Sequence, residues 1–303
     1  MASLLECVPN CSEGRDPAFL RDVQEAVSCV QGVALLDSSA DPDHHRSVFT
    51  IAGAPDAVPE ALFEIAKLAV ARVDLRAHKG KHPRMGALDV APFVPMGDMT
   101  AEQAIQAARQ FAQRLWAELG VPSFFYGLAA MTPGRERLED VRLGEFEALV
   151  QGDGSRLPDV GGPRVHPTAG ATAVGVRKPL IAWNVELATA DVQPARRIAR
   201  MIRESSGGLP AVKALGLALP TRGTTQVSMN LVDYERTGLR TVLDWIDQLA
   251  AAEGVTVVDS ELIGLIPRKA LGQDGGEGLR IRGFNSSMIL ENRIEEELGV
   301  VLS

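Results

Sequence analysis

The same order of strands and helices occurs twice along this chain of 303 residues. Strands are expected where apolar side chains alternate, and helices where they recur every three or four residues. In the first half the strands are expected over 4–8, 33–37, 47–52 and 87–94, and the helices over 17–30 and 56–72. In the second half the strands are expected over 181–187, 215–219, 227–231 and 255–258, and the helices over 192–205 and 239–252. Each half therefore has the order β-α-β-β-α-β, which is that of the split unit of ferredoxin-like domains.

This repeat predicts an α/β (α+β) protein of two ferredoxin-like subdomains, residues 1–177 and 178–303. The first subdomain carries an extension with a helix over 100–119, a strand over 123–126 and a helix over 138–150. A Gly- and Pro-rich segment over 151–170 follows, and long loops in compact domains are often functional. A last helix is expected over 287–297.

Composition excludes several classes of protein. The 31 Lys and Arg against 39 Asp and Glu give a net charge of −8, which argues against nucleic-acid binding. No apolar run approaches the ~18 residues that a membrane span needs, and the N-terminus does not resemble a signal peptide. The three cysteines, Cys7, Cys11 and Cys29, lack zinc-site spacing and fit a reduced compartment. We therefore expect a cytoplasmic protein.

The densest group of chemically active side chains is the segment 78–86. His78, Lys79, Lys81, His82 and Arg84 lie within seven residues of a net acidic chain. One interpretation is a solvated basic turn. The other is an anion site with a histidine in it, suited to a carboxylate substrate. A histidine of pKa ~6.5 can accept and donate a proton near neutral pH.

Two further segments have the composition of a ligand site. The loop 161–170 matches neither a Walker motif nor GxGxxG, and its glycines either approach a flat ligand or only form turns. The strand around 224–232 has an uncharged polar face of Gln226, Ser228 and Asn230. Amides and hydroxyls on one face suit a heterocycle, although a polar contact between domains would need the same residues.

Metal binding is the competing use of the histidines. His44 and His45, with Asp41, Asp43, His78 and His82, provide ligands suitable for zinc. However, HExxH is absent, and adjacent histidines on a strand point apart. A zinc hydrolase is therefore the less favoured alternative, and we expect no metal.

Several segments resemble the formiminotransferase domain family, and the resemblance extends over nearly the whole chain. They are VPNCSEGRD (8–16), LLDSSADPDHHRSVFTIAG (35–53), HKGKHPRMGALDVAPFVP (78–95), RVHPTAGATAVGVRKPLIAWNVEL (164–187), SSGGLPAVKALGL (205–217), TQVSMNL (225–231) and LIGLIPRKAL (262–271). The HPRMGALDV and HPTAGA segments are the most specific of these. The chain is most similar to the stand-alone bacterial members of the family.

The resemblance implies a fold and a reaction. The two sheets would face a substrate cleft that holds folate, with the helices outside. The formimidoyl group of N-formimidoyl-L-glutamate would pass to N5 of tetrahydrofolate, a co-substrate, in histidine degradation. The motif places the general base and acid at His82. A separate cyclodeaminase would act next, and the resemblance suggests a homodimer.

The resemblance also implies binding residues. The folate-binding loop corresponds to Gly161, Gly162, Pro163, Arg164, Val165, His166, Pro167, Thr168, Ala169 and Gly170. We assign substrate binding to Ser39, His45, Arg46, Lys79, Arg84, Gln226, Ser228 and Asn230, with Lys81 as a further candidate. Animal members have an Asp aligned with Ser39, so Asp37 or Asp41 would have to replace it here. Two alternatives are formyl transfer from N-formylglutamate and a non-catalytic folate-binding module.

Overall fold

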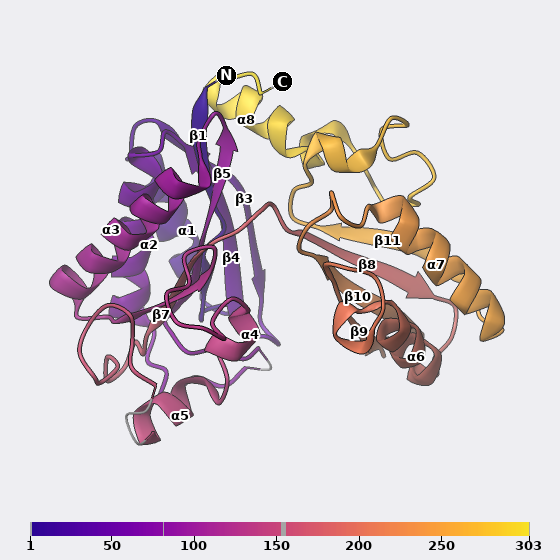
Figure 1. Cartoon of the computed structure of the whole chain (residues 1–303), viewed down its shortest axis with the longest axis horizontal. Helices are drawn as coiled ribbons and strands as arrows, with labels where there is room; N and C mark the ends of the chain where they lie inside the picture. Colours follow the sequence, from indigo (N-terminus) through magenta and orange to yellow (C-terminus); the bar gives the residue numbers. More distant parts are fainter. Residues whose placement is uncertain (1, 81, 153–155, 303) are drawn as a thin grey trace. The chain divides into compact units, whose positions relative to one another are not determined.

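The computed structural model describes residues 2–80, 82–152 and 156–302. It divides into two compact units, Met1–Arg177 with Ile294–Ser303, and Lys178–Arg293 (Figure 1). The last ten residues thus belong to the first unit, although the sequence analysis put them in the second. Within the described residues there are eight α-helices and two sheets, so the chain is a mixed α/β protein.

The first unit is built on a seven-stranded sheet. Its strands are β1 (Ser3–Cys7), β2 (Asn10–Cys11), β3 (Val33–Asp41), β4 (Arg46–Gly53), β5 (Leu88–Gly97), β6 (Ser123–Gly127) and β7 (Thr172–Val176). β3 pairs with β4, β4 pairs with both β1 and β2, and these two pair with β5, all antiparallel. β7 and then β6 extend the sheet in parallel beyond β5.

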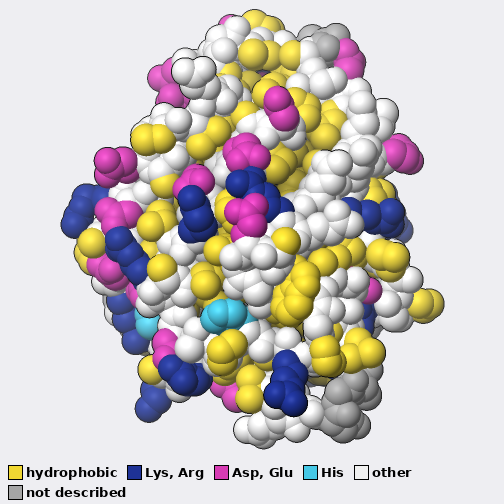
Figure 2. All heavy atoms as spheres, turned by 90° about the vertical axis from the view of Figure 1, so that its left-hand side faces the viewer, with side chains coloured by type: hydrophobic (Ala, Val, Ile, Leu, Met, Phe, Trp, Pro, Cys, Tyr) yellow, Lys and Arg dark blue, Asp and Glu magenta, His cyan; other side chains and the backbone are white. Residues whose placement is uncertain are grey.

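Three helices cover one face of this sheet (Figure 1). They are α1 (Pro17–Ser28), α2 (Ala57–Arg72) and α3 (Ala101–Leu119). Asp16 caps α1 by accepting from Ala18 N, and Thr100 forms a capping box with Gln103 at α3. Their apolar faces bury Phe19, Leu62 and Phe111 in one core with the sheet. On the side shown in Figure 2, basic and acidic side chains lie interspersed, so the charge of this face has no single sign.

Three segments of the first unit differ from the expectation. The strand expected over 4–8 is β1, but the short strand β2, which follows it after Val8 and Pro9, was not predicted; Pro9 has no N–H for the ladder. The helix expected over 138–150 is two short helices, α4 (Leu138–Val141) and α5 (Glu145–Gln151), separated at Gly144, whose φ is +77°. The strand β7 was not predicted at all.

The second unit has a four-stranded antiparallel sheet in the order β11-β8-β10-β9. Its elements are β8 (Ile181–Leu187), α6 (Val192–Ile202), β9 (Val212–Leu219), β10 (Thr224–Leu231), α7 (Leu239–Ala252) and β11 (Val257–Ile263). Three short 3₁₀ helices (Glu204–Ser206, Arg268–Leu271 and Ser286–Met288) and α8 (Leu290–Leu298) complete the chain. The core buries Trp183 and Ile246 completely. No helix in the described part of the chain has the length and apolar character to cross a membrane.

Candidate active site

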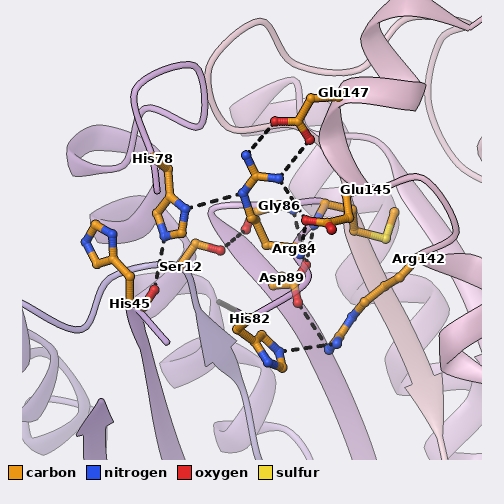
Figure 3. A network of polar contacts seen from close by, with 11 residues as sticks. Ser12, His45, His78, His82, Arg84, Gly86, Asp89, Arg142, Glu145 and Glu147 are labelled. Atoms are coloured by element: carbon orange, nitrogen blue, oxygen red, sulfur yellow. Dashed lines mark hydrogen bonds and ion pairs between the residues drawn. The ribbon is translucent and has the colours of Figure 1, made fainter. Parts of the chain in front are cut away.

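His82 lies in the segment that joins α2 to β5, and a buried carboxylate fixes this segment. Oδ1 of Asp89, near the start of β5, accepts hydrogen bonds from Met85 N at 2.7 Å and Gly86 N at 3.2 Å. Ala87 N donates to Ala169 O at 2.9 Å, and the Ser12 hydroxyl donates to Gly86 O at 2.7 Å (Figure 3). The backbone after His82 is therefore fixed from three directions.

Two arginines contact the imidazole of His82. Nη1 of Arg142 lies 3.3 Å from Nε2, and Nη1 of Arg46 lies 3.4 Å from Nε2 and 3.5 Å from Nδ1. Burial, together with the charges of Arg46 and Arg142, lowers the pKa of His82 to about 3. His82 is therefore neutral at physiological pH, which is the state that a general base needs before it takes a proton.

Arg142 links His82 to Asp89. Its Nη2 lies 3.1 Å from Asp89 Oδ2, and the two side chains are only 12% and 2% exposed (Figure 3). The pKa of Asp89 is raised, because the effect of burial outweighs that of Arg142, the two backbone N–H groups and Arg46, which lower it. Arg142 follows α4, so the break in the expected helix is where this arginine leaves the helix and reaches the site.

The sequence analysis missed both Arg142 and Asp89. Asp89 lies within the segment that resembles the family, but a single carboxylate in an apolar strand was not considered. The available signal was its burial, because a charged residue inside an apolar run is costly unless it is paired. Arg142 had no local signal, since it lies 60 residues from His82 in sequence.

A pair of stacked histidines, His45 and His78, lies near the segment that carries His82. Arg84 Nε donates to His78 Nδ1 at 3.3 Å, so the proton of His78 is on Nε2, which donates to His45 O at 3.0 Å. The rings of His45 and His78 stack with centroids 4.2 Å apart. His45 Nε2 lies 3.2 Å from Glu13 Oε1. Burial lowers the pKa of His78, which favours the neutral imidazole that its two hydrogen bonds require.

Arg84 already has carboxylate partners. Its Nη1 donates to Glu145 at 2.9 Å and to Glu147 at 2.8 Å, and its Nη2 donates to Glu147 at 2.6 Å (Figure 3). Phe146 N donates to Arg84 O at 3.0 Å. The guanidinium thus anchors α5, and Arg46 is better placed than Arg84 to meet an incoming anion near His82.

The other residues assigned to the first unit lie around the same segment. Lys79 is exposed, and Lys81 falls outside the described residues. Ser39 is exposed on β3, opposite Val48. Of the carboxylates considered in its place, Asp41 lies opposite Arg46 and contacts His44 Nδ1 at 2.6 Å.

The end of the Gly-rich loop lies against the His82 segment. Gly86 bridges to Gly170, and Met85 O accepts from Ala171 N at 3.0 Å. Within the loop, His166 Nδ1 accepts from Ala169 N at 3.0 Å, so this nitrogen is unprotonated. At the start of the loop, Gly161 has φ +111° and packs against Trp116 and Pro122. The structure therefore brings one end of this loop to the segment that carries His82.

Gln226, Ser228 and Asn230 lie in the second unit, on the face of β10 opposite to its core residues. Across the strand pair with β8, Gln226 is opposite Glu186 and Ser228 is opposite Asn184. This face of the sheet is thus polar on two neighbouring strands. Among the residues that the structure describes, no three His, Cys, Asp or Glu side chains are grouped to hold a metal ion.

Comparison with known proteins identifies the family. Residues 4–177 match the formiminotransferase domain, N-terminal subdomain, and residues 182–277 match the formiminotransferase domain. The chain is 42% identical to a glutamate formimidoyltransferase of Streptococcus pyogenes serotype M1, over 97% of this chain and 99% of that protein. It is 39% identical to one of Thermoplasma acidophilum, over 97% of this chain and 98% of that protein. It is also 42% identical to the formimidoyltransferase-cyclodeaminase of Mus musculus, over 89% of this chain and 51% of that protein.

The two matched domains cover most of the chain, and the chain belongs to the formiminotransferase family. It is therefore an enzyme that transfers one-carbon groups.

Proposed function

We propose that this enzyme transfers the formimidoyl group of N-formimidoyl-L-glutamate to N5 of tetrahydrofolate, as a step of histidine degradation. The bacterial and archaeal glutamate formimidoyltransferases, matched over almost their full length, support the reaction. The observation that carries the mechanism is the neutral imidazole of His82, half-buried beside two arginines.

His82 would move one proton in two steps. N5 of tetrahydrofolate attacks the amidine carbon, and a C–N5 bond forms while His82 takes the N5 proton. The bond from that carbon to the glutamate nitrogen then breaks, and the imidazolium returns the proton to this leaving nitrogen. Atoms and charge balance without a metal or a covalent enzyme intermediate. Proton transfer by one positioned side chain contributes about 10²–10⁴ in rate.

We propose that both units are ferredoxin-like. The β-α-β-β-α-β order of each unit and the strand order β11-β8-β10-β9 support this assignment. Loop 161–170 is our candidate for folate binding, and the polar face of Gln226, Ser228 and Asn230 is our candidate for substrate binding. The cleft between the sheets, the homodimer, the cytoplasmic location and the separate cyclodeaminase stay predictions of the resemblance.

Glutamate release from N-formimidoyl-L-glutamate tests the function. We expect wild type to release glutamate only when tetrahydrofolate is present, and His82→Ala to be slower by about 10²–10⁴. Unchanged release by a folded His82→Ala would assign the proton transfer to another group. Faster turnover of N-formyl-L-glutamate would favour formyl transfer, and folate binding without turnover of either donor would favour a binding module.

A further inference from the structure

The two arginines at His82 have hydrogen-bonding capacity that the protein leaves unused. Nε of Arg46 and Nε of Arg142 are both buried, and neither has a hydrogen-bond partner in the structure. Both arginines instead direct Nη1 at the imidazole of His82, which cannot accept well from two cations. A buried donor without an acceptor costs free energy, so this arrangement is suited to an anion that supplies the missing acceptors.

The charges of the side chains around His82 do not balance either. Asp89 is the buried carboxylate paired with Arg142. Asp41, opposite Arg46 on β3, has its oxygens occupied by His44 Nδ1 at 2.6 Å and by the backbone N–H groups of Asp43 and His44 at 2.9 Å. Arg84, by contrast, has two carboxylates for its one charge. The excess positive charge is thus localised at Arg46 and Arg142, in a chain whose net charge is −8.

We propose that Arg46 and Arg142 form a subsite for the α-carboxylate of an N-substituted amino dicarboxylic acid, beside His82. The inference rests on the proposed function, whose donor has this chemistry. The α-carboxylate is chosen because only the α-carbon and the nitrogen separate it from the amidine carbon. The γ-carboxylate is two methylene groups further away. A subsite that touches the catalytic imidazole therefore fits the α-carboxylate.

Binding at this subsite would change the histidine. The titratable and charged groups around His82 are Arg46 on β4, Arg142 after α4, His44 and Asp41 at the β3–β4 turn, and Asp89 on β5, which pairs with Arg142. A carboxylate between the arginines would take over their hydrogen bonds and offset their charge. The imidazole would then be a stronger base in the complex than in the free enzyme. Asp89 would act as a positioning residue, because it holds Arg142 in reach.

Two stable ligands separate this subsite from the rest of the site. N-acetyl-L-glutamate carries the α-carboxylate, and 4-acetamidobutyrate has the same chain without it. By calorimetry, we expect wild type to bind N-acetyl-L-glutamate about tenfold to hundredfold more tightly than 4-acetamidobutyrate. Arg142→Gln should lose most of this preference. Arg114→Gln, which removes an arginine paired with Glu60 and Glu118 on the helical layer, should keep it.

Two more variants distinguish loss of the subsite from misfolding. Arg142→Gln leaves the buried Asp89 unpaired, so Asp89→Asn/Arg142→Gln removes both charges, and Arg142→Lys keeps the positive one. Thermal unfolding identifies the variants that fold. We expect the folded double variant to lose the preference and Arg142→Lys to retain part of it. N-acetyl-L-glutamate should also raise the NMR-monitored pKa of His82 in wild type, but not in the double variant.

The outcomes are distinct from those of the transferase assay, because neither ligand needs tetrahydrofolate or turnover. If folded Arg142→Gln and the double variant both keep the full preference, the subsite is refuted while the transferase function stands. Binding of neither ligand by wild type in the millimolar range also refutes it. A third outcome is that both variants lose the preference while wild type shows no transferase activity. This outcome supports the subsite and removes the proposed function.

Discussion

The low pKa of His82 has a consequence for stability as well as for catalysis. Folded His82 has a pKa of about 3, whereas an unfolded histidine has one of ~6.5. Between these values the unfolded chain binds a proton that the folded chain does not, so acid favours unfolding. The contribution of neutral His82 is complete above pH ~6.5 and decreases as the pH falls toward 3.

We therefore expect His82→Gln to be less sensitive to acid than wild type. The free energy of unfolding of wild type should fall more steeply between pH 7 and pH 5, by at most about 1.4 kcal/mol per pH unit for this one group. Urea unfolding of both proteins at several pH values measures the difference. His78 and His166, whose pKa values burial also lowers, contribute to both proteins alike. Parallel curves for the two proteins would contradict the expectation.

At the residue scale, the sequence predicted the basic segment but not how its charges are used. His82 and Arg46 come from segments that resemble the family, and the structure places them in contact. Arg84 looked equally available, yet its two glutamates lie on a helix some sixty residues later. A run of basic residues shows where charge is concentrated, whereas the partner of each charge depends on the tertiary fold.

At the scale of elements, one glycine allows the loop 161–170 to meet the His82 segment. Gly170 has φ +68°, and a Cβ there would lie 2.1 Å from Met85 O. Gly170→Ala therefore combines backbone strain with a clash that moves either the loop or residues 85–86. We expect it to destabilise the protein by at least about 2 kcal/mol and to weaken tetrahydrofolate binding.

Gly223→Ala is the matched control for this prediction. Gly223 has φ +65°, and a Cβ there would meet nothing within 4 Å, so it carries the strain without the clash. A cost of about 1 kcal/mol is expected at this position. Urea unfolding and folate titration of both variants make the comparison. Equal losses of stability would mean that the contact between loop and segment contributes nothing.

The elements that the sequence predicted well are those with long periodic patterns and clear caps. α3 begins at the expected Thr100/Gln103 capping box and ends at Gly120. β7 was missed because Thr172–Val176 is a short apolar run, and its parallel partners, β5 and β6, are distant in sequence. Pairing of this kind depends on a tertiary arrangement that periodicity does not record.

At the scale of the whole molecule, each repeat of the element order has its own large hydrophobic core, and the first unit also holds a smaller third cluster around Phe124 and Tyr126. The core of the first unit is built from α1, α2, α3 and its sheet, and that of the second from α6, α7 and the four-stranded sheet. No residue of the described chain belongs to both clusters. The repeated order led us to expect two subdomains, 1–177 and 178–303, whereas Ile294–Ser303 belongs to the same compact unit as Met1–Arg177.

Two separate cores predict that the units open separately. Leu243 on α7 is 1% exposed in the second core, and Leu62 on α2 is fully buried in the first. Leu243→Ala should cost about 2–5 kcal/mol, because it leaves a cavity among buried side chains. By hydrogen exchange, we expect amide protection to fall in the strands β8–β11 and to stay unchanged in β1–β5. Leu62→Ala should give the reverse pattern. Loss of protection in both units from either substitution would mean that the chain unfolds as one cooperative unit. The two cores would then be energetically coupled, although they are built from different residues.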